Sequence, residues 1–401
     1  MTIPKKLIIA YALKNATEHD GLSNPNTVLN SLFNHGLTKS QIPTILPTIK
    51  TLVAEINALK PNEQSLLYEK HKNLITYRDE KQGLPELPNN PKKVIMRFAP
   101  SASGPMHIGH ALSASLSYLY FKKYSGRFYV RIEDTNPEAS YKESYKLLKE
   151  DAKWLFDNDA EIIIQSERMD NYYKYAEKII KKDMAYICNC DPEKFKTLIQ
   201  EKTSCPCRKL TTKENLQRWK KMLNSEGYKQ GDAVLRFKSG TDLKNPALRD
   251  FPLARINTHP HPLQKLKYRV WPLMNLSVAV DDIEMKMTHI IRGKDHRDNA
   301  EKQKMIFNTL NKPVPWTGFL GIIHFKDLEL STSKMREAIN NKDYTGWDDP
   351  KLPTLISLKN QGYKPESFWK FAEQIGLNEI DKKMTKKEFF DLLRGFDKKS
   401  G

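Results

Sequence analysis

The stretch SASGPMHIGH, residues 101–110, decides the fold. A short apolar run over 94–98 precedes it and predicts a buried strand, and the pattern over 111–123, which closes on lysines, predicts a helix. A strand, a glycine-containing loop and a helix in this order are typical of sites where backbone N–H groups and the helix dipole hold a phosphate. His107 and His110 stand three residues apart in the first turn, where their rings share one face and can donate hydrogen bonds to phosphate oxygens.

Strand and helix patterns continue to alternate beyond this loop. Further strands are predicted over 128–132 and 160–168, and amphipathic helices over 139–156 and 169–188. The order β-α-β-α-β-α predicts an α/β fold with a Rossmann-like, doubly wound parallel sheet. Ligands of such sheets bind at the carboxyl ends of the strands.

The second part of the chain predicts that this sheet is split by an insertion. The segments 231–240 and 249–256 have the pattern of antiparallel strands, and 268–282 returns to a helical pattern. A strand and a polar turn are expected over 288–296, and the chain is helical and basic from 345 onward. We find no internal repeat.

The overall charge favours a polyanionic partner. Lys and Arg number 66 against 48 Asp and Glu, which gives a net charge of +18 over 401 residues. A lysine-rich proteome would give the same balance. The sequence has no apolar run of 18 residues, so we expect no membrane span, and its start lacks a signal-peptide cleavage site. A cytoplasmic protein is therefore expected.

All four cysteines lie in two close pairs, which predicts a metal site. The pairs are C-N-C at 188–190 and C-P-C at 205–207. A disulfide within C-x-C is strained, and a reducing cytosol disfavours disulfides between the pairs. Four thiolates from two knuckles suit a structural Zn²⁺ held by Cys188, Cys190, Cys205 and Cys207. The alternative is a knuckle that keeps this fold but binds metal weakly.

Two sequence signatures resemble those of one enzyme family. An isolated H-x-x-H pair also fits helix capping or half of a metal site, but RFAPSASGPMHIGHA, 97–111, resembles the first signature of the class I aminoacyl-tRNA synthetases, in particular the archaeal-type glutamyl branch. LSTSK, 330–334, resembles the second signature of the same family. The resemblance covers essentially the whole chain. It implies that ATP activates L-glutamate to glutamyl adenylate, which is transferred to the 3′ end of tRNA(Glu) and gives Glu-tRNA, AMP and pyrophosphate.

The resemblance also implies domains and cofactors. ATP is expected as substrate, with Mg²⁺ and a structural Zn²⁺ as cofactors. The implied domains are an N-terminal helical domain (1–82), a linker (83–91), the first half of the Rossmann catalytic domain (92–187), an acceptor-binding insertion with the zinc knuckle (188–265), the second Rossmann half with the LSTSK loop (266–340) and a helical stem-contact domain (341–401).

Three ionisable residues are expected at strand ends around one crevice. Arg97, Glu133 and Arg292 would fit a ligand with one ammonium and two carboxylates, because Arg binds carboxylates in a bidentate manner. Taken singly, each is as well explained by a surface or structural ion pair. The resemblance implies that Arg97 and Arg292 hold the side-chain carboxylate, that Ser101 and Glu133 hold the α-amino end, and that Met274 lines the pocket where bacterial relatives carry Tyr.

The remaining implied site residues handle ATP. The implied catalytic residues are His107, His110 and Lys334, and the implied ATP-binding residues are His107, Gly109, His110, Ser331, Ser333 and Lys334. The chain departs from the family pattern in having Asn136 where an Asp is common.

Three rival functions stay open at this stage. A dinucleotide-forming nucleotidyltransferase would be shorter and lack the insertion. A non-catalytic paralogue would be expected to lose the histidines or Lys334. A glutaminyl enzyme is disfavoured by Arg292 and by the sequence A-P-S-A-S-G at 99–104. Relatives continue into anticodon-binding β-barrels, so a shortened chain, or one partnered by a second polypeptide that carries them, is expected together with the partner tRNA(Glu).

Overall fold

The computed structural model describes residues 3–75 and 83–398 and divides into two compact units, 1–82 and 83–401. Residues 76–82, at the end of the predicted N-terminal domain, and residues 399–401, at the end of the predicted stem-contact domain, lie outside the described residues. The described part of the first unit is helical, as its periodicity predicts. Its α-helices are α1 (Lys5–Glu18), α2 (Pro25–Leu32), α3 (Ile42–Asn57) and α4 (Pro61–His71).

The second unit contains the predicted parallel sheet. Strands β1 (Val94–Phe98), β2 (Gly126–Ile132) and β3 (Glu161–Ile164) pair in parallel in the order β1-β2-β3. The first strand has the predicted bounds because its side chains are almost all buried, which favours the apolar residues that surround Arg97. Helices α5 (Ile108–Tyr124) and α6 (Ser144–Leu155) connect these strands.

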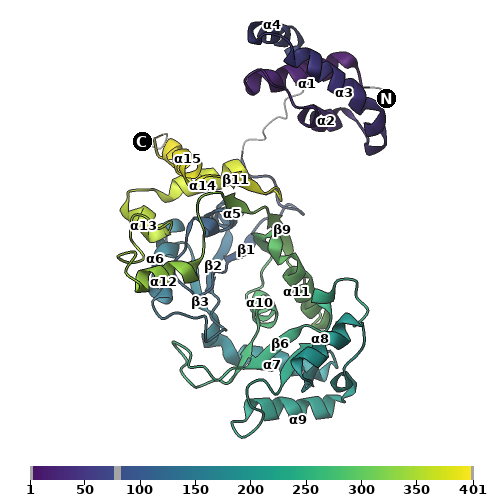
Figure 1. Cartoon of the computed structure of the whole chain (residues 1–401). Helices are drawn as coiled ribbons and strands as arrows, with labels where there is room; N and C mark the ends of the chain where they lie inside the picture. Colours follow the sequence, from purple (N-terminus) through teal and green to yellow (C-terminus); the bar gives the residue numbers. More distant parts are fainter. Residues whose placement is uncertain (1–2, 76–82, 399–401) are drawn as a thin grey trace. The chain divides into compact units, whose positions relative to one another are not determined.

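A second parallel pair extends this layer. Strand β8 (His289–Gly293) pairs with β9 (Trp316–Leu320), and the backbone N–H of Thr288 donates to the carbonyl of Ile95 at 3.0 Å, so β8 begins beside β1. One hydrophobic core includes residues of β1, β2, β8, β9 and α5. The two halves that are distant in sequence therefore form one structural layer, which Figure 1 shows around the label β1.

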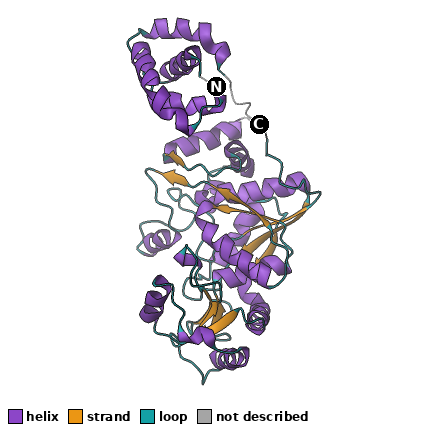
Figure 2. Cartoon of the chain, turned by 90° about the vertical axis from the view of Figure 1, so that its right-hand side faces the viewer, coloured by secondary structure: helices purple, strands orange, loops and turns teal. Residues whose placement is uncertain are grey.

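The insertion is built on its own antiparallel sheet. Its four strands pair in the order β4-β5-β6-β7 and are the lower group of orange arrows in Figure 2. They are β4 (Ala185–Cys188), β5 (Val234–Phe237), β6 (Pro252–Ile256) and β7 (Val270–Pro272), accompanied by helices α8 (Pro192–Gln200) and α9 (Thr212–Leu223).

Three predicted helices are shorter than the sequence pattern indicated, and the one predicted over 139–156 is α6, which begins at Ser144 and ends at Leu155. The helix predicted over 169–188 is α7 (Met169–Lys181), because Asp183 takes a left-handed conformation (φ 56°) that ends it. The residues that follow form β4 instead. The helix predicted over 268–282 is α10 (Met274–Glu284), because the residues before it pair with the insertion sheet as β7.

The C-terminal part is mainly helical. The prediction of helix alone beyond residue 345 is wrong at one point, because β11 (Lys382–Met384) pairs in parallel with β10 (Ile323–Phe325). The helices beyond residue 345 are α13 (Leu355–Asn360), α14 (Pro365–Ile375) and α15 (Lys386–Lys398), and they are preceded by α11 (Arg297–Thr309) and α12 (Thr332–Asn340). None of the helices in the described ranges has the length and apolar character needed to cross a membrane.

Candidate active site

A pocket of about 320 Å³ opens where β1, β2 and β8 end. This is the edge of a parallel sheet at which ligands are expected to bind. The structure brings all five predicted amino-acid-binding residues to its lining: Arg97, Ser101, Glu133, Met274 and Arg292. His110, from the first signature, lines the same pocket. Their roles toward a substrate remain predictions.

A buried ion network lies behind this pocket. Nε and one terminal nitrogen of Arg97 donate to the two carboxylate oxygens of Asp282, at 3.1 and 3.2 Å. Arg131, fully buried in β2, donates to Asp282 at 2.6 Å and to Glu133 at 3.0 Å. Burial alone would raise the pKa of Asp282, but Arg97 and Arg131 hold it at about 2. The charge of Arg97 is therefore already matched by a carboxylate.

The sequence prediction missed this network. Arg131 stands inside an apolar strand, and Asp281 and Asp282 stand inside an apolar helical run. A charge within such a run is a signal in itself, because a buried charge needs a partner. No sequence pattern indicates which of these residues pair with one another.

Arg292 differs from Arg97 in having no carboxylate partner. None of the ion pairs within the described ranges includes it, and its guanidinium donates to the amide oxygen of Gln303 at 3.0 Å. Its side chain is 9% exposed. Burial and then the neighbouring Arg97 lower the pKa of Arg292 from 12.5 to about 10. A buried, unmatched cation that lines a pocket is the arrangement expected of a binding site for an anionic group.

The two signature histidines are held as neutral hydrogen-bond donors. His107 caps α5, and its Nδ1 accepts from the N–H of Gly109 at 3.1 Å. Nδ1 of His110 accepts from the N–H of His107 at 3.3 Å, and the rings stack with centroids 3.9 Å apart. Burial lowers the pKa of His110 to about 4 and, together with His110, lowers that of His107 well below 6.5. Each neutral ring therefore carries its proton on Nε2.

The structure brings the two signature segments into contact at two glycines. A Cβ on Gly109 would lie 2.9 Å from Cδ1 of Leu330, and a Cβ on Gly104 would lie 2.4 Å from Cγ2 of Thr332. Both distances are too short for a side chain, so these positions need glycine for close packing. The LSTSK segment therefore rests directly on the loop that begins α5.

The polar residues of LSTSK lie at the start of α12 and are not among the residues that line the pocket. Ser331 caps the helix by accepting from the N–H of Lys334 at 3.4 Å, and Ser333 is exposed. The Lys334 ammonium is exposed and pairs with Glu329 at 2.7 Å. Because exposed pairs of this kind contribute little energy, Lys334 can leave Glu329 for a stronger anion.

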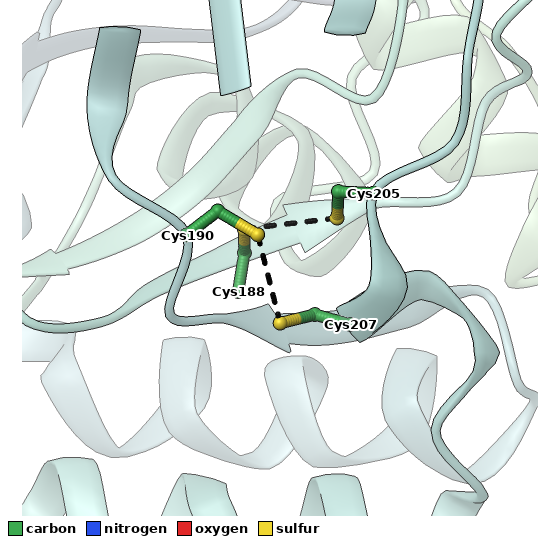
Figure 3. Close-up of side chains that lie close together, drawn as sticks. All are labelled: Cys188, Cys190, Cys205 and Cys207. Carbon is green, nitrogen blue, oxygen red and sulfur yellow. Dashed lines mark hydrogen bonds between the residues drawn. The ribbon is translucent and has the colours of Figure 1, made fainter. Parts of the chain in front are cut away.

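The four cysteines converge on one point, as Figure 3 shows. Their sulfur atoms all lie within 4.8 Å of one another, with Cys188 3.8 Å from Cys205 and Cys190 3.9 Å from Cys207. A tetrahedral site with metal–sulfur bonds of about 2.3 Å has sulfur atoms roughly 3.8 Å apart. This four-cysteine cluster is thus able to hold a metal ion.

Residues 93–394 match the family described as the catalytic domain of class I tRNA synthetases for E and Q. The chain therefore belongs to this family, which confirms the predicted family and α/β fold class. It is 41% identical over 391 residues to a glutamate–tRNA ligase of Methanothermobacter thermautotrophicus and 42% identical over 395 residues to one of Methanosphaera stadtmanae. Each match covers 97% of this chain and 70% of the relative.

A solved structure of similar fold is the glutamate–tRNA synthetase of Elizabethkingia anophelis. It matches with a TM-score of 0.53 and 21% identity, over 77% of this chain and 70% of that chain. At this identity the match supports the fold alone.

Proposed function

We propose that this protein activates L-glutamate with ATP and transfers the glutamyl group to the 3′ end of tRNA(Glu), giving Glu-tRNA, AMP and pyrophosphate. The observation that carries the proposal is Arg292 in the pocket at the strand ends, a buried cation that has no carboxylate partner among the residues that the structure describes. The two relatives at about 40% identity, which are glutamate–tRNA ligases, support it.

The charges of the pocket favour glutamate over glutamine. The γ-carboxylate of the substrate would bind Arg292, which lacks an anionic partner, while Arg97 would contribute N–H donors whose charge Asp282 already offsets. The substrate ammonium would lie toward Glu133 and Ser101. The neutral amide of glutamine would leave the buried Arg292 unmatched, which costs free energy.

The activation step requires hydrogen-bond donors to the phosphate oxygens more than it requires proton-donating acids. An oxygen of the α-carboxylate of glutamate attacks the α-phosphorus of ATP, and the bond between that phosphorus and the leaving pyrophosphate breaks. The Nε2–H groups of His107 and His110 would donate to phosphate oxygens that gain charge in this step. Lys334 would exchange Glu329 for the leaving pyrophosphate. The tRNA hydroxyl then attacks the adenylate carbonyl, and AMP leaves.

We further propose that Cys188, Cys190, Cys205 and Cys207 bind one structural Zn²⁺. The sulfur separations of 3.8 and 3.9 Å fit tetrahedral thiolate ligation of this ion. The metal would join the end of β4 to the turn at Pro206–Lys209. The following stay predictions: Mg²⁺ bound together with ATP, a second polypeptide with an anticodon-binding region, and a cytoplasmic location.

The test is ATP–pyrophosphate exchange with a panel of amino acids, in the presence of tRNA(Glu). Exchange that depends on glutamate is expected, with glutamine disfavoured by at least about 100-fold because the buried Arg292 would stay unmatched. Exchange with glutamine at the glutamate rate would contradict the charge argument. Absence of exchange with any amino acid would contradict the proposed enzyme activity itself.

A further inference from the structure

The pocket at the strand ends contains a buried amide to which the proposed function gives no role, Gln303 of α11. Its side chain is 5% exposed. Its Oε1 accepts a hydrogen bond from a terminal nitrogen of Arg292 at 3.0 Å, and its Nε2 donates to Oδ1 of Asn275 on α10 at 3.4 Å. Gln303 therefore links Arg292 to two neighbouring helices, α10 and α11, whose labels stand side by side in Figure 1.

The two neighbours of Gln303 fix the orientation of its amide. The guanidinium of Arg292 can only donate hydrogen bonds, so the amide oxygen of Gln303 must face it. The NH₂ group then faces the oxygen of Asn275, which can only accept. The Arg292 guanidinium is thus held in place by a side chain that carries no net charge.

The charges behind the pocket balance one another without Arg292. The buried ion network joins three arginines to three carboxylates: Arg97, Arg131, Arg168, Glu133, Asp281 and Asp282. Arg292 lies beside this network, but none of the ion pairs among the residues that the structure describes includes it. The network and Arg292 together therefore carry one positive charge in excess.

This excess charge matches glutamate and does not match glutamine. At neutral pH free glutamate carries one net negative charge, whereas free glutamine carries none. The match requires a neutral side chain at position 303. A glutamate side chain there would have the shape of Gln303, but its carboxylate would lie at ion-pair distance from Arg292 and would cancel the excess charge.

We propose that Gln303 is a specificity-determining residue, because its uncharged amide orients Arg292 and leaves the charge of Arg292 available to the γ-carboxylate of the substrate. The inference rests on the proposed function, since it concerns which amino acid the pocket selects for activation. Two observations support it together: the hydrogen bond between Gln303 and Arg292, and the balanced ion network that excludes Arg292.

The experiment compares three variants of the full chain. Gln303→Glu adds a carboxylate with almost no change of shape, and Gln303→Met removes the amide without adding a charge. Asn308→Asp is the control, because it makes the same amide-to-carboxylate change at an exposed position of α11. ATP–pyrophosphate exchange is measured with glutamate and with glutamine in the presence of tRNA(Glu), and thermal unfolding serves as the folding check.

Gln303→Glu should lower the ratio of kcat/KM for glutamate to kcat/KM for glutamine by at least about 100-fold, because Arg292 would already have an anionic partner. The KM for ATP should stay unchanged. Gln303→Met should raise the KM for glutamate roughly 10- to 100-fold, as for a lost hydrogen bond to a charged group, but should keep the preference for glutamate. Asn308→Asp should behave like the wild-type protein.

The comparison separates the role of Gln303 from the proposed function. If the wild-type protein prefers glutamate and Gln303→Glu keeps that preference, the Gln303 proposal is wrong and the proposed function stands. The proposal is equally wrong if Gln303→Met leaves the KM for glutamate unchanged or loses the preference, and this variant decides the question even where Gln303→Glu does not fold. If the wild-type protein shows no exchange with either amino acid, the proposed function fails, and the inference fails with it.

Discussion

Replacing Arg292 with Gln tests the electrostatic basis of amino-acid selection. Arg292 is 9% exposed, and no carboxylate in the described part of the chain pairs with this pocket cation. Removing one member of a buried ion pair costs about 3–5 kcal/mol, so kcat/KM for glutamate should fall roughly 10²- to 10⁴-fold. Activity toward glutamine should fall much less, because glutamine makes no ion pair with Arg292.

The same substitution should not weaken the fold. The pKa of Arg292 falls from 12.5 to about 10 because burial and Arg97 disfavour its charge, so folding disfavours the charged guanidinium by roughly 3 kcal/mol. Removing that charge should leave the melting temperature unchanged or raise it. Arg97→Gln should instead destabilise the protein, because it removes a partner of the buried Asp282.

The assays are steady-state aminoacylation with glutamate and with glutamine, and thermal unfolding. Arg297→Gln, an identical change at an exposed position on α11, is the matched control and should retain wild-type kinetics. The reasoning is refuted if Arg292→Gln keeps its glutamate activity and selectivity. It is also refuted if Arg292→Gln unfolds as readily as Arg97→Gln.

Four further predictions concern the signature loops and the metal cluster. His110→Ala should lower the rate of glutamate activation by about 10²- to 10³-fold. Because the pKa of His110 is about 4, the pH–rate profile of the wild-type protein should show no histidine ionisation near 6.5. An inflection near that pH would contradict the role of His110 as a neutral donor. The same lowered pKa predicts that the His110 contribution to the free energy of unfolding is full above pH 6.5 and decreases as the pH falls toward 4. Gly109→Ala should lower the free energy of unfolding by about 1–3 kcal/mol and slow activation, because its Cβ would lie too close to Leu330. In the control Gly395→Ala the added Cβ has no neighbour within 4 Å, so urea unfolding should show unchanged or higher stability. Elemental analysis should find about one zinc per chain, and Cys205→Ser should lose it; reduced, folded protein without metal would contradict the zinc proposal.

Local pattern was sufficient to predict the elements that lie at the centre of the fold. The short, mainly apolar run predicted β1 with its correct bounds, and the small residues before His107 indicated the loop that begins α5. The same local pattern failed at 185–188, where four consecutive apolar residues follow a helical pattern but pair with β5. Whether residues 185–188 form a helix or a strand depends on a partner strand far along the chain, and the periodicity of a local segment contains no information about that partner.

In the candidate site, too, the sequence predicted single residues but not the contacts between distant ones. Single residues such as Arg292 and Glu133 could be assigned to strand ends because the fold places strand ends together. The pairing of Arg97 with Asp282 could not be predicted, since it joins β1 to α10 across the two halves of the sheet. This pairing changes the interpretation of the site, because it leaves Arg292 as the unmatched cation.

The most direct test of the account is aminoacylation of tRNA(Glu) by the purified chain with ATP and labelled glutamate or glutamine, resolved on acid gels. We predict that label from glutamate becomes attached to the 3′ end of the tRNA, with one AMP formed for each glutamyl group transferred. Label from glutamine should attach at least about 100-fold more slowly, because the buried guanidinium of Arg292 would remain unmatched. Equal charging with both amino acids, or AMP formation without attachment to tRNA, would contradict the account.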